Sequence, residues 1–307
     1  MSQVSAFAPA TVANLGPGFD VLGLAVDGAG DTVTATLVNE PGVHISRITG
    51  DGGELPTDPE ANTAAIAARE TLSLAGFDVG VSLEIHKGLP LCSGLGSSAA
   101  SAAAAAFATN QLIGSPLRKP ALVGPCIEAE AAVSGRHADN VAPSLLGGLI
   151  LVRSVDPIDL IRLPIPDDLT VVVVTPDVAI PTKDARAVLP QDIPLSTMVQ
   201  STAQIASLVS ACYSGDLSLL SRCLVDEVVT PARLPLIPGG QTAISAALSA
   251  GALGASISGA GPSLFALCRS PRSAKSAAQA MTEAFSAAGL SATTRISPAN
   301  CPGARRV

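Results

Sequence analysis

The chain has 307 residues, enough for two domains of ordinary size with buried cores. Hydrophobic residues make up 48% of it but aromatic residues only 2%, so its cores must be built from aliphatic side chains and alanine. The net charge of −7 argues against nucleic acid or an anionic membrane as the main partner.

The cysteines and the N-terminus indicate a cellular compartment. The six cysteines show no Cys-x-x-Cys spacing and only three histidines occur, so we expect reduced thiols and no zinc site. Residues 1–5 lack the basic character of a signal peptide, and no apolar segment is long enough to span a membrane. We therefore expect a cytoplasmic protein without a membrane partner.

The N-terminal part of the chain predicts strands first and then a helix. Residues 32–37 alternate threonine with valine, alanine and leucine, which is typical of a strand with one solvent-facing side. Residues 43–48 are expected to pair with this strand as a hairpin. Asn62 or Thr63 then caps a helix that Gly76 closes.

The next elements surround a loop rich in glycine and serine. Residues 81–86 alternate apolar and polar side chains and predict a strand, whereas the alanine-dense residues 102–108 favour a helix. Pro120 is expected to start a second helix. Residues 134–143 form a polar stretch typical of turns, and residues 147–152 predict a buried strand.

The C-terminal part of the chain begins near a proline-rich segment. Prolines at residues 157, 164 and 166 favour a domain boundary near residue 160, because extended chain of this kind makes few contacts. After it we expect, in order, a strand at 170–174, a loop at 181–186 that leads to a short helix, helices at 197–212, 216–224 and 241–250, strands at 255–258 and 264–268, a helix at 273–288 and a strand at 291–296.

The loop before the alanine-rich helix, residues 88–101, has the features of an anion site. A helix start leaves about four backbone N–H groups without internal partners, and the helix dipole favours negative charge there. Gly94 and Gly96 let the backbone approach a ligand closely, and the loop's serines add hydroxyls. These features together suit a phosphate.

Other interpretations of this loop fit less well. A Walker P-loop needs a Gly-Lys pair, which occurs nowhere in the chain. Residues 94–99 match the G-x-G-x-x-A dinucleotide fingerprint, but that fingerprint also needs an acidic residue about twenty positions on, closing a second strand. Residues 114–120 contain neither. The structural alternative is a turn of small residues that caps a core helix.

A longer match identifies a family. Residues 89–99 resemble the ATP-binding motif of the GHMP kinases, which include galactokinase, homoserine kinase and mevalonate kinase, and only Cys92 departs from the usual smaller residue. Residues 9–20 resemble the family's first motif in the form that its homoserine kinase branch carries. Residues 137–143 are more characteristic of that branch still, and residues 258–263 resemble the third motif.

The resemblance runs from residue 7 to about residue 265 and implies an α/β (α+β) fold of two domains. The N-terminal domain would be like domain 2 of ribosomal protein S5 and the C-terminal domain ferredoxin-like, with the active site between them. Combined with the proline-rich boundary, this gives an ATP-binding domain at 1–160 and a C-terminal domain at 161–307.

The function implied by the resemblance is ATP-dependent phosphorylation of the side-chain hydroxyl of L-homoserine, with Mg²⁺, as a step of threonine biosynthesis. Relatives of this branch also imply a homodimer. Two alternatives stay open at this point: another small-molecule kinase of the family, such as a mevalonate kinase, and a non-catalytic sensor of nucleotide or amino acid with the same fold.

The family's nucleotide and metal positions can be carried over one by one. Ser98 and Glu130 would hold Mg²⁺, a hard ion that prefers oxygen ligands. Spacing does not choose between Glu128 and Glu130, but Glu130 matches the family's metal carboxylate. The residues expected to bind ATP are Pro90, Leu91, Cys92, Ser93, Gly94, Leu95, Gly96, Ser97, Ser98, Ala99, Ala100, Gly259 and Gly261.

The acceptor positions suit a small zwitterion. By the resemblance, Arg186 and Arg233 would bind its carboxylate, and Asn14 and Asp20 its amino group, although these last two could simply shape a Gly-Pro-Gly turn. The expected substrate-binding residues are Asn14, Asp20, His137, Asn140, Thr182, Arg186 and Arg233, with His137 more ordinary as a structural hydrogen-bonding residue.

The expected catalytic residues are Asn140, Asp139 and Arg186. Several relatives outside this branch have a catalytic aspartate where Asn140 stands, and an amide cannot accept a proton as a general base does. We therefore expect transfer by positioning and charge neutralisation, with Asn140 orienting the acceptor hydroxyl and Asp139 as the reserve candidate for a base.

Overall fold

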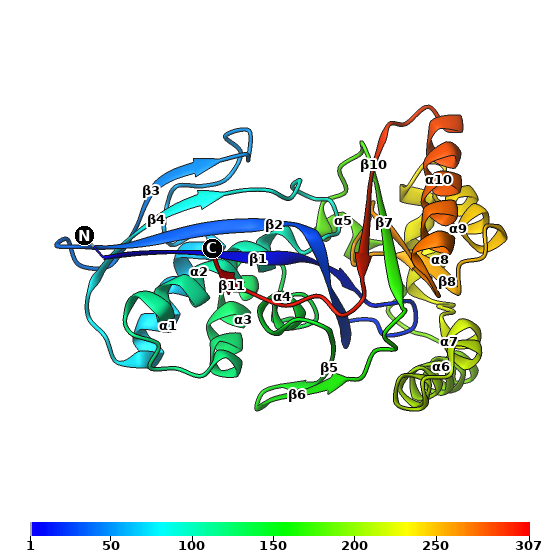
Figure 1. Ribbon diagram of the computed structural model, residues 1–307, viewed down its shortest axis with the longest axis horizontal. Helices are drawn as coiled ribbons and strands as arrows, with labels where there is room; N and C mark the ends of the chain where they lie inside the picture. The colour runs from blue at the N-terminus through cyan, green and yellow to red at the C-terminus, as the bar shows by residue number, and fades with distance from the viewer. Residues whose placement is uncertain (1) are drawn as a thin grey trace.

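The computed structural model describes residues 2–307 as two β-sheets with helices packed against them (Figure 1). The larger sheet consists of β1 (Gln3–Ala13), β2 (Leu22–Val38), β3 (Val43–Thr49), β4 (Gly80–His86), β5 (Leu149–Val155), β6 (Ile158–Leu163) and β11 (Arg305–Arg306). Its main path runs β11-β1-β2-β4-β3, and β5 and β6 continue from the other end of β2.

Helices cover one face of this sheet, below it in Figure 1. They are α1 (Thr63–Ala75), α2 (Ser97–Leu112), the short 3-10 helix η1 (Lys119–Leu122), α3 (Val123–Ala131) and α4 (Val141–Leu146). The central helix, α2, contacts β1 and β2 as well as α1, α3 and α4. Its residues 102–106 are all alanines with no exposed surface, because only small side chains let a helix lie this close to its neighbours on every side.

The smaller sheet has the antiparallel order β10-β7-β9-β8. Its strands are β7 (Thr170–Pro176), β8 (Gly254–Ile257), β9 (Leu264–Cys268) and β10 (Ala292–Pro298). Around it lie α5 (Thr182–Ala187), α6 (Leu195–Ser214), α7 (Leu217–Cys223), α8 (Val229–Arg233), the 3-10 helix η2 (Leu234–Leu236), α9 (Gly240–Ser249) and α10 (Pro271–Ala287). The helices and strands expected in this half match these to within a residue or two. The loop expected at 181–186 is wrong, because residues 182–187 themselves form α5.

The four consecutive valines of β7 explain how the two sheets are joined. Val172 and Val174 pack in the core under α9 and α10. Val171 and Val173 point to the opposite face, into a second core that includes residues of β1, β2, α6 and α7. Both faces of β7 are therefore buried, as an unbroken apolar run predicts. This shared core fixes the position of the second half against the first.

The predicted hairpin of residues 32–37 with 43–48 is wrong. β4 lies between these two strands, antiparallel to β2 and parallel to β3. Gly80 permits this insertion, since a Cβ there would lie 1.9 Å from the carbonyl oxygen of Glu40 in the turn between β2 and β3. Alternation along a strand predicts its buried face but not its neighbour, so the local pattern could not exclude the hairpin.

Two further regions of the N-terminal half, the ends of α1 and the stretch before α4, complete the fold. Asn62 caps α1 and Gly76 ends it, as predicted. The polar stretch 134–143 leads directly into α4, a short helix that the sequence pattern did not indicate.

The larger sheet includes residues on both sides of the predicted domain boundary at residue 160. β6 extends to Leu163, and β11, near the C-terminus, pairs with β1. The division into domains at residue 160 stays a prediction. No helix within residues 2–307 is long and apolar enough to cross a membrane.

Candidate active site

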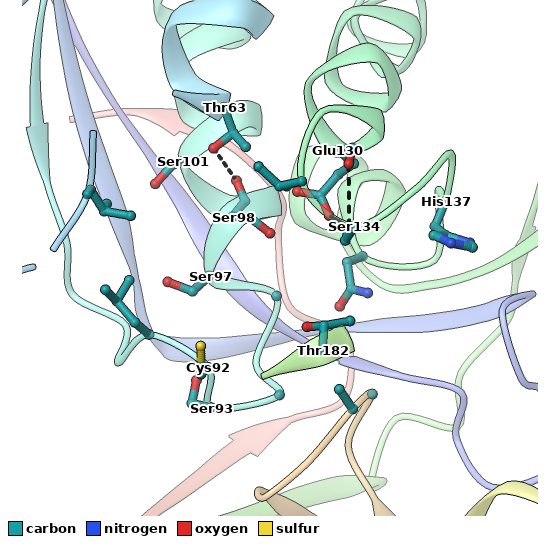
Figure 2. Close-up of a pocket in the computed structure, with 18 of the residues that line it drawn as sticks. Thr63, Cys92, Ser93, Ser97, Ser98, Ser101, Glu130, Ser134, His137 and Thr182 are labelled. Carbon is teal, nitrogen blue, oxygen red and sulfur yellow. Dashed lines mark hydrogen bonds between the residues drawn. The ribbon is translucent and has the colours of Figure 1, made fainter. Parts of the chain in front are cut away.

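A cavity of about 360 Å³ is lined by residues from both halves of the chain. The first half contributes the glycine-rich loop and Glu130, and the second half contributes Thr182, Arg186 and Arg233. Figure 2 shows the side of the cavity that the glycine-rich loop forms, where Ser98 lies toward Glu130. The hydroxyls of Ser93 and Ser97 instead donate to the backbone carbonyls of Pro90 and Leu89. The fold therefore places most of the sequence-predicted residues around one cavity.

The glycine-rich loop connects β4 to α2 and has a conformation that needs glycine. Gly94 and Gly96 have φ angles of 75° and 65°, in the left-handed region. A Cβ on Gly94 would lie 2.5 Å from the carbonyl oxygen of Ser258, whose hydroxyl donates to the Gly94 oxygen. Gly96 precedes the first turn of α2, and no side chain of residues 2–307 caps it. The first N–H groups of α2 are thus available to an anion.

Not every residue expected to bind ATP reaches the cavity. Leu91, Cys92, Ser93, Gly94, Gly96, Ser97, Ser98 and Gly259 line it. Pro90, Leu95, Ala99, Ala100 and Gly261 do not lie in its lining. Leu95 and both alanines are buried in the core, which leaves only their backbone near a ligand. Cys92, the departure from the family pattern, is exposed and adopts a φ of 52° at the loop's outer bend.

A buried ion pair that the sequence analysis missed supports this loop from below. Lys87 pairs with Asp31, and its ammonium also donates to the Ser97 carbonyl and the Ser101 hydroxyl, both at 2.8 Å. Asp31 accepts from the backbone N–H groups of residues 88 and 89 at 3.0 and 3.2 Å. The available signal was a charged residue among the apolar residues of β2, with an opposite charge directly after β4. The pair ties the start of the loop to the start of α2.

The predicted metal residues, Ser98 and Glu130, lie on neighbouring helices beside the loop (Figure 2). Ser134 donates to Oε2 of Glu130 at 2.9 Å, while Oε1 is buried and has no hydrogen-bond partner within residues 2–307. Burial raises the pKa of Glu130, and the nearby hydroxyls of Ser98 and Ser134 oppose this shift. A buried carboxylate oxygen without a partner next to a hydroxyl fits Mg²⁺, which needs few protein ligands and takes phosphate oxygens.

The neighbouring Glu128 has a different environment. It points to the surface, where Nη1 of Arg136 donates to its Oε2 at 2.7 Å. Both side chains are about half exposed, so the pair contributes little to stability. The structure thus separates two glutamates that spacing alone could not, and it gives Arg136 a surface partner. No group of three or more His, Cys, Asp or Glu side chains suited to a metal occurs within residues 2–307.

On the opposite side of the cavity, Arg186 and Asp20 form a two-pronged ion pair. Nη1 donates to Oδ2 at 3.2 Å and Nη2 donates to Oδ1 at 3.1 Å. Nη2 also donates to Nε2 of His137 at 2.9 Å. Burial lowers the pKa of His137; the Asp20 charge raises it and the Arg186 charge lowers it. A neutral imidazole can accept the arginine's hydrogen bond.

Arg233 lies deeper than Arg186 and is only 2% exposed. Its Nε donates to the carbonyl of Ala185 at 2.9 Å and its Nη1 to that of Gly259 at 2.7 Å. The ring of Phe19, which the sequence analysis did not single out, lies 5.4 Å from the Cζ of Arg233 and 5.6 Å from that of Arg186. One aromatic ring therefore contacts both guanidinium groups.

Asn14 and Asp20 flank the Gly-Pro-Gly turn at residues 16–18. Asn14 and Asp20 both have positive φ angles, 72° and 58°. The Asn14 side chain accepts from the backbone N–H of Asp20 and donates to the Gly259 carbonyl, each at 3.2 Å. Asn14 thus shapes the turn and also links the two halves of the chain beside the cavity. The two interpretations of this residue, turn former and site residue, are compatible.

Asp139 and Asn140 lie between the loop and the arginines. Asp139 is 3% exposed, and burial, with the negative charges of Asp20 and Glu130, raises the pKa of its carboxyl to about 7. Oδ1 of Asn140 accepts from the Thr11 hydroxyl at 2.7 Å, and its Nδ2 donates to Asp139 at 3.4 Å. Thr11 is a further residue that the sequence analysis missed, because a threonine within a strand carries no distinctive signal.

Comparison with known proteins agrees with this geometry. The family description "GHMP kinases N terminal domain" matches residues 62–148, and "GHMP kinases C terminal" matches residues 208–287. The chain is 49% identical to the homoserine kinase of Arabidopsis thaliana, over 99% of this chain and 85% of that protein. It is 45% identical to the homoserine kinase of Chlorobaculum tepidum, over 99% and 98% of the two chains.

A solved structure shows the same arrangement of both halves. The crystal structure of homoserine kinase from Cytophaga hutchinsonii superposes with a TM-score of 0.97 at 45% identity, covering 100% of this chain and 98% of that one. The two-domain fold expected from the sequence motifs is thereby confirmed. The chain belongs to the GHMP kinase family, in the branch of the homoserine kinases.

Proposed function

We propose that the protein transfers the γ-phosphoryl group of ATP to the side-chain hydroxyl of L-homoserine, forming O-phospho-L-homoserine. One observation carries this proposal: the uncapped start of α2 and a carboxylate–arginine set for a zwitterion line the same cavity. A kinase of this class needs its phosphate charge neutralised and its acceptor held in line with the γ-phosphate. The high identity to homoserine kinases supports this choice of acceptor.

The nucleotide phosphates would lie against the first turn of α2. The backbone N–H groups of Gly94 to Ser98 would cradle them, held in place by the Lys87–Asp31 pair beneath. Ser98 and Glu130 would hold Mg²⁺, which neutralises charge on the phosphates when it is bound. The unpartnered Oε1 of Glu130 supports this assignment.

The amino acid would bind at the other end of the cavity. Its carboxylate suits the forks of Arg186 and Arg233, and its ammonium suits Asp20 and the amide oxygen of Asn14. Mevalonate has a carboxylate but no ammonium, so it would leave Asp20 without a cationic ligand group. His137 and Thr182 also line this side and complete the proposed binding set.

Transfer itself would depend on positioning and charge neutralisation. Asn140 would orient the acceptor hydroxyl, and Arg186 would neutralise developing charge. Asp139 is the alternative base: its raised pKa of about 7 suits proton acceptance near neutral pH. We favour the role of Asn140 because its amide is held by Thr11 at the junction of both binding regions.

A coupled ADP-release assay tests the proposed function. The protein is supplied with ATP, Mg²⁺ and either L-homoserine, mevalonate or no acceptor. We expect release only with homoserine, and mass spectrometry should detect O-phospho-L-homoserine in the same sample. Release with mevalonate alone would assign the protein to another small-molecule kinase, and nucleotide binding without turnover would indicate a sensor.

The same proposal includes a cellular compartment, a pathway and an oligomeric state. We place it in the cytoplasm, in threonine biosynthesis, as a homodimer with domains at residues 1–160 and 161–307. The exposed apolar side chains of α6 support an interface with a second copy: Leu195, Met198 and Val199 are 72%, 51% and 59% exposed. Sedimentation of the wild type and of Met198→Glu would test this, since the charge should shift a dimer toward monomer.

A further inference from the structure

Thr11 contacts both functional regions of the cavity at once. It lies in β1 and has no exposed surface. Its backbone N–H donates to the carbonyl of Leu95, in the glycine-rich loop, at 3.0 Å. Its hydroxyl donates to Oδ1 of Asn140 at 2.7 Å. One residue is thus hydrogen-bonded to the loop that we assign to ATP and to the side chain that we assign to the acceptor hydroxyl.

The packing around Gly96 makes this connection tight. A Cβ on Gly96 would lie 2.2 Å from the Thr11 hydroxyl and 2.8 Å from Oδ1 of Asn140. The backbone that starts α2 therefore lies directly on the Thr11–Asn140 hydrogen bond. Neither partner can shift toward the helix without a clash, so the three groups form one rigid contact.

The Thr11 hydroxyl also sets the orientation of the Asn140 amide. A primary amide has a donor end and an acceptor end that differ little in shape, so its orientation depends on its hydrogen bonds. Thr11 donates to the oxygen, which leaves the NH₂ group directed to the side of Asp139. Without that donor, the amide could rotate and present its oxygen where its nitrogen now lies.

We propose that Thr11 is a positioning residue for the phosphoryl transfer. It orients Asn140 and holds it at a constant distance from the start of α2, so that the acceptor hydroxyl and the phosphates keep one relative geometry. This inference rests on the proposed kinase function. An effect of this kind appears mainly in kcat, since a misplacement of about 1 Å can reduce a rate about 100-fold.

The test compares variants of Thr11 with a matched control in the homoserine-dependent ADP-release assay. Thr11→Val keeps the branched shape and replaces the hydrogen-bond donor with a methyl group, which lies against Gly96. Thr11→Ala removes the same donor and places no methyl group there. Thr11→Ser keeps the hydroxyl. Thr71→Val is the matched control, because Thr71 is equally buried but its hydroxyl donates to Ala67 within α1. Circular dichroism and thermal unfolding establish that each variant is folded.

We expect kcat to fall about 10- to 100-fold in Thr11→Val and Thr11→Ala, with KM for ATP and for homoserine within about threefold of the wild type. Thr11→Ser should restore kcat to within about threefold, and Thr71→Val should not change it. If Thr11 acts through Asn140, adding Thr11→Val to Asn140→Ala should lower kcat no further.

Each alternative outcome is informative. A kcat near the wild-type value in Thr11→Val or Thr11→Ala would overturn the inference, and so would effects of Thr11→Val and Asn140→Ala that multiply. If Thr11→Val does not fold, Thr11→Ala and Thr11→Ser provide the comparison. Failure of the proposed function would look different, because the wild type itself would then form no phosphohomoserine.

Discussion

Arg186 binds Asp20 through both of its terminal nitrogens, although the two residues are 166 positions apart in the chain. Each of the two lies in a different half of the chain, and both line the cavity. They are the same two residues that we assign to the carboxylate and the ammonium of the amino acid. The carboxylate of a zwitterion can pair with Arg186 in place of Asp20, and its ammonium can pair with Asp20 in place of Arg186. A plain carboxylic acid can make only the first of these pairs.

The first prediction concerns this pair. Asp20→Asn should raise KM for homoserine about 10- to 100-fold, because the ammonium loses a charge-assisted hydrogen bond, and should leave KM for ATP unchanged. Steady-state kinetics with each substrate varied in turn would measure both constants. Asp177→Asn, at an exposed position outside the cavity, is the control. An unchanged KM for homoserine would contradict the assignment of Asp20.

Phe19 provides the second prediction. Its ring contacts both guanidinium groups, so Phe19→Leu should loosen their placement and raise KM for homoserine about 3- to 10-fold. The matched control is Phe107→Leu, which removes a ring in α2 whose centroid lies 5.3 Å from Nζ of Lys119. Equal effects of the two substitutions on KM would indicate general loss of packing rather than a role of Phe19 in binding.

The third prediction separates the two glutamates of α3. Glu130→Gln removes the buried carboxylate that we assign to Mg²⁺, so the Mg²⁺ concentration for half-maximal activity should rise about tenfold or more. Glu128→Gln removes an exposed carboxylate one helical half-turn away and should leave that concentration unchanged. Titration of activity with MgCl₂ at constant ATP would measure both. An identical Mg²⁺ requirement in Glu130→Gln and the wild type would exclude Glu130 as a metal ligand.

Asp139 leads to a fourth prediction, on the chemistry. If transfer depends on positioning, Asp139→Asn should lower kcat by less than about tenfold, because the amide keeps an oxygen for the hydrogen bond from Asn140. Parallel measurement of homoserine binding by calorimetry shows whether the site is intact. A loss of several orders of magnitude in kcat with normal binding would make Asp139 the general base.

The same substitution predicts a pH dependence of stability. The folded-state pKa of Asp139, about 7, lies above its ordinary value of 3.8, so the folded protein holds the proton more tightly than the unfolded chain. This carboxyl therefore lowers stability progressively as pH rises from about 4 to about 7. Asp139→Asn should raise Tm more at pH 8 than at pH 5. A Tm difference that does not vary with pH would contradict the raised pKa.

The fifth prediction concerns the support beneath the loop. Lys87→Met leaves Asp31 buried without its partner, so the free energy of unfolding should fall by about 3–5 kcal/mol. Adding Asp31→Asn should recover part of the loss, because the uncompensated charge is then removed. Urea unfolding of the wild type, Lys87→Met and the double variant would measure this. If Lys87→Met is as stable as the wild type, the pair is not what holds the loop.

The sequence by itself determined the local features of this protein. Short-range patterns were sufficient for the glycine-rich loop, the helix after it and most strands and helices of the C-terminal half, because capping, alternation and small-residue runs act between neighbours in the chain. They did not predict the short helices α5 and α8. The motifs also identified the family, and with it Ser98, Glu130 and the two arginines as residues of one site.

Only the tertiary structure decided which distant residues meet. It placed β4 between β2 and β3, paired Asp20 with Arg186, set Phe19 against both arginines and joined Thr11 to Asn140. No local pattern encodes these contacts, since each depends on how two sheets pack through a shared core. Residues that come into contact only through this packing are distant in the sequence, so no pattern among neighbouring residues predicts the contact. At this site, Phe19 and Thr11 are examples.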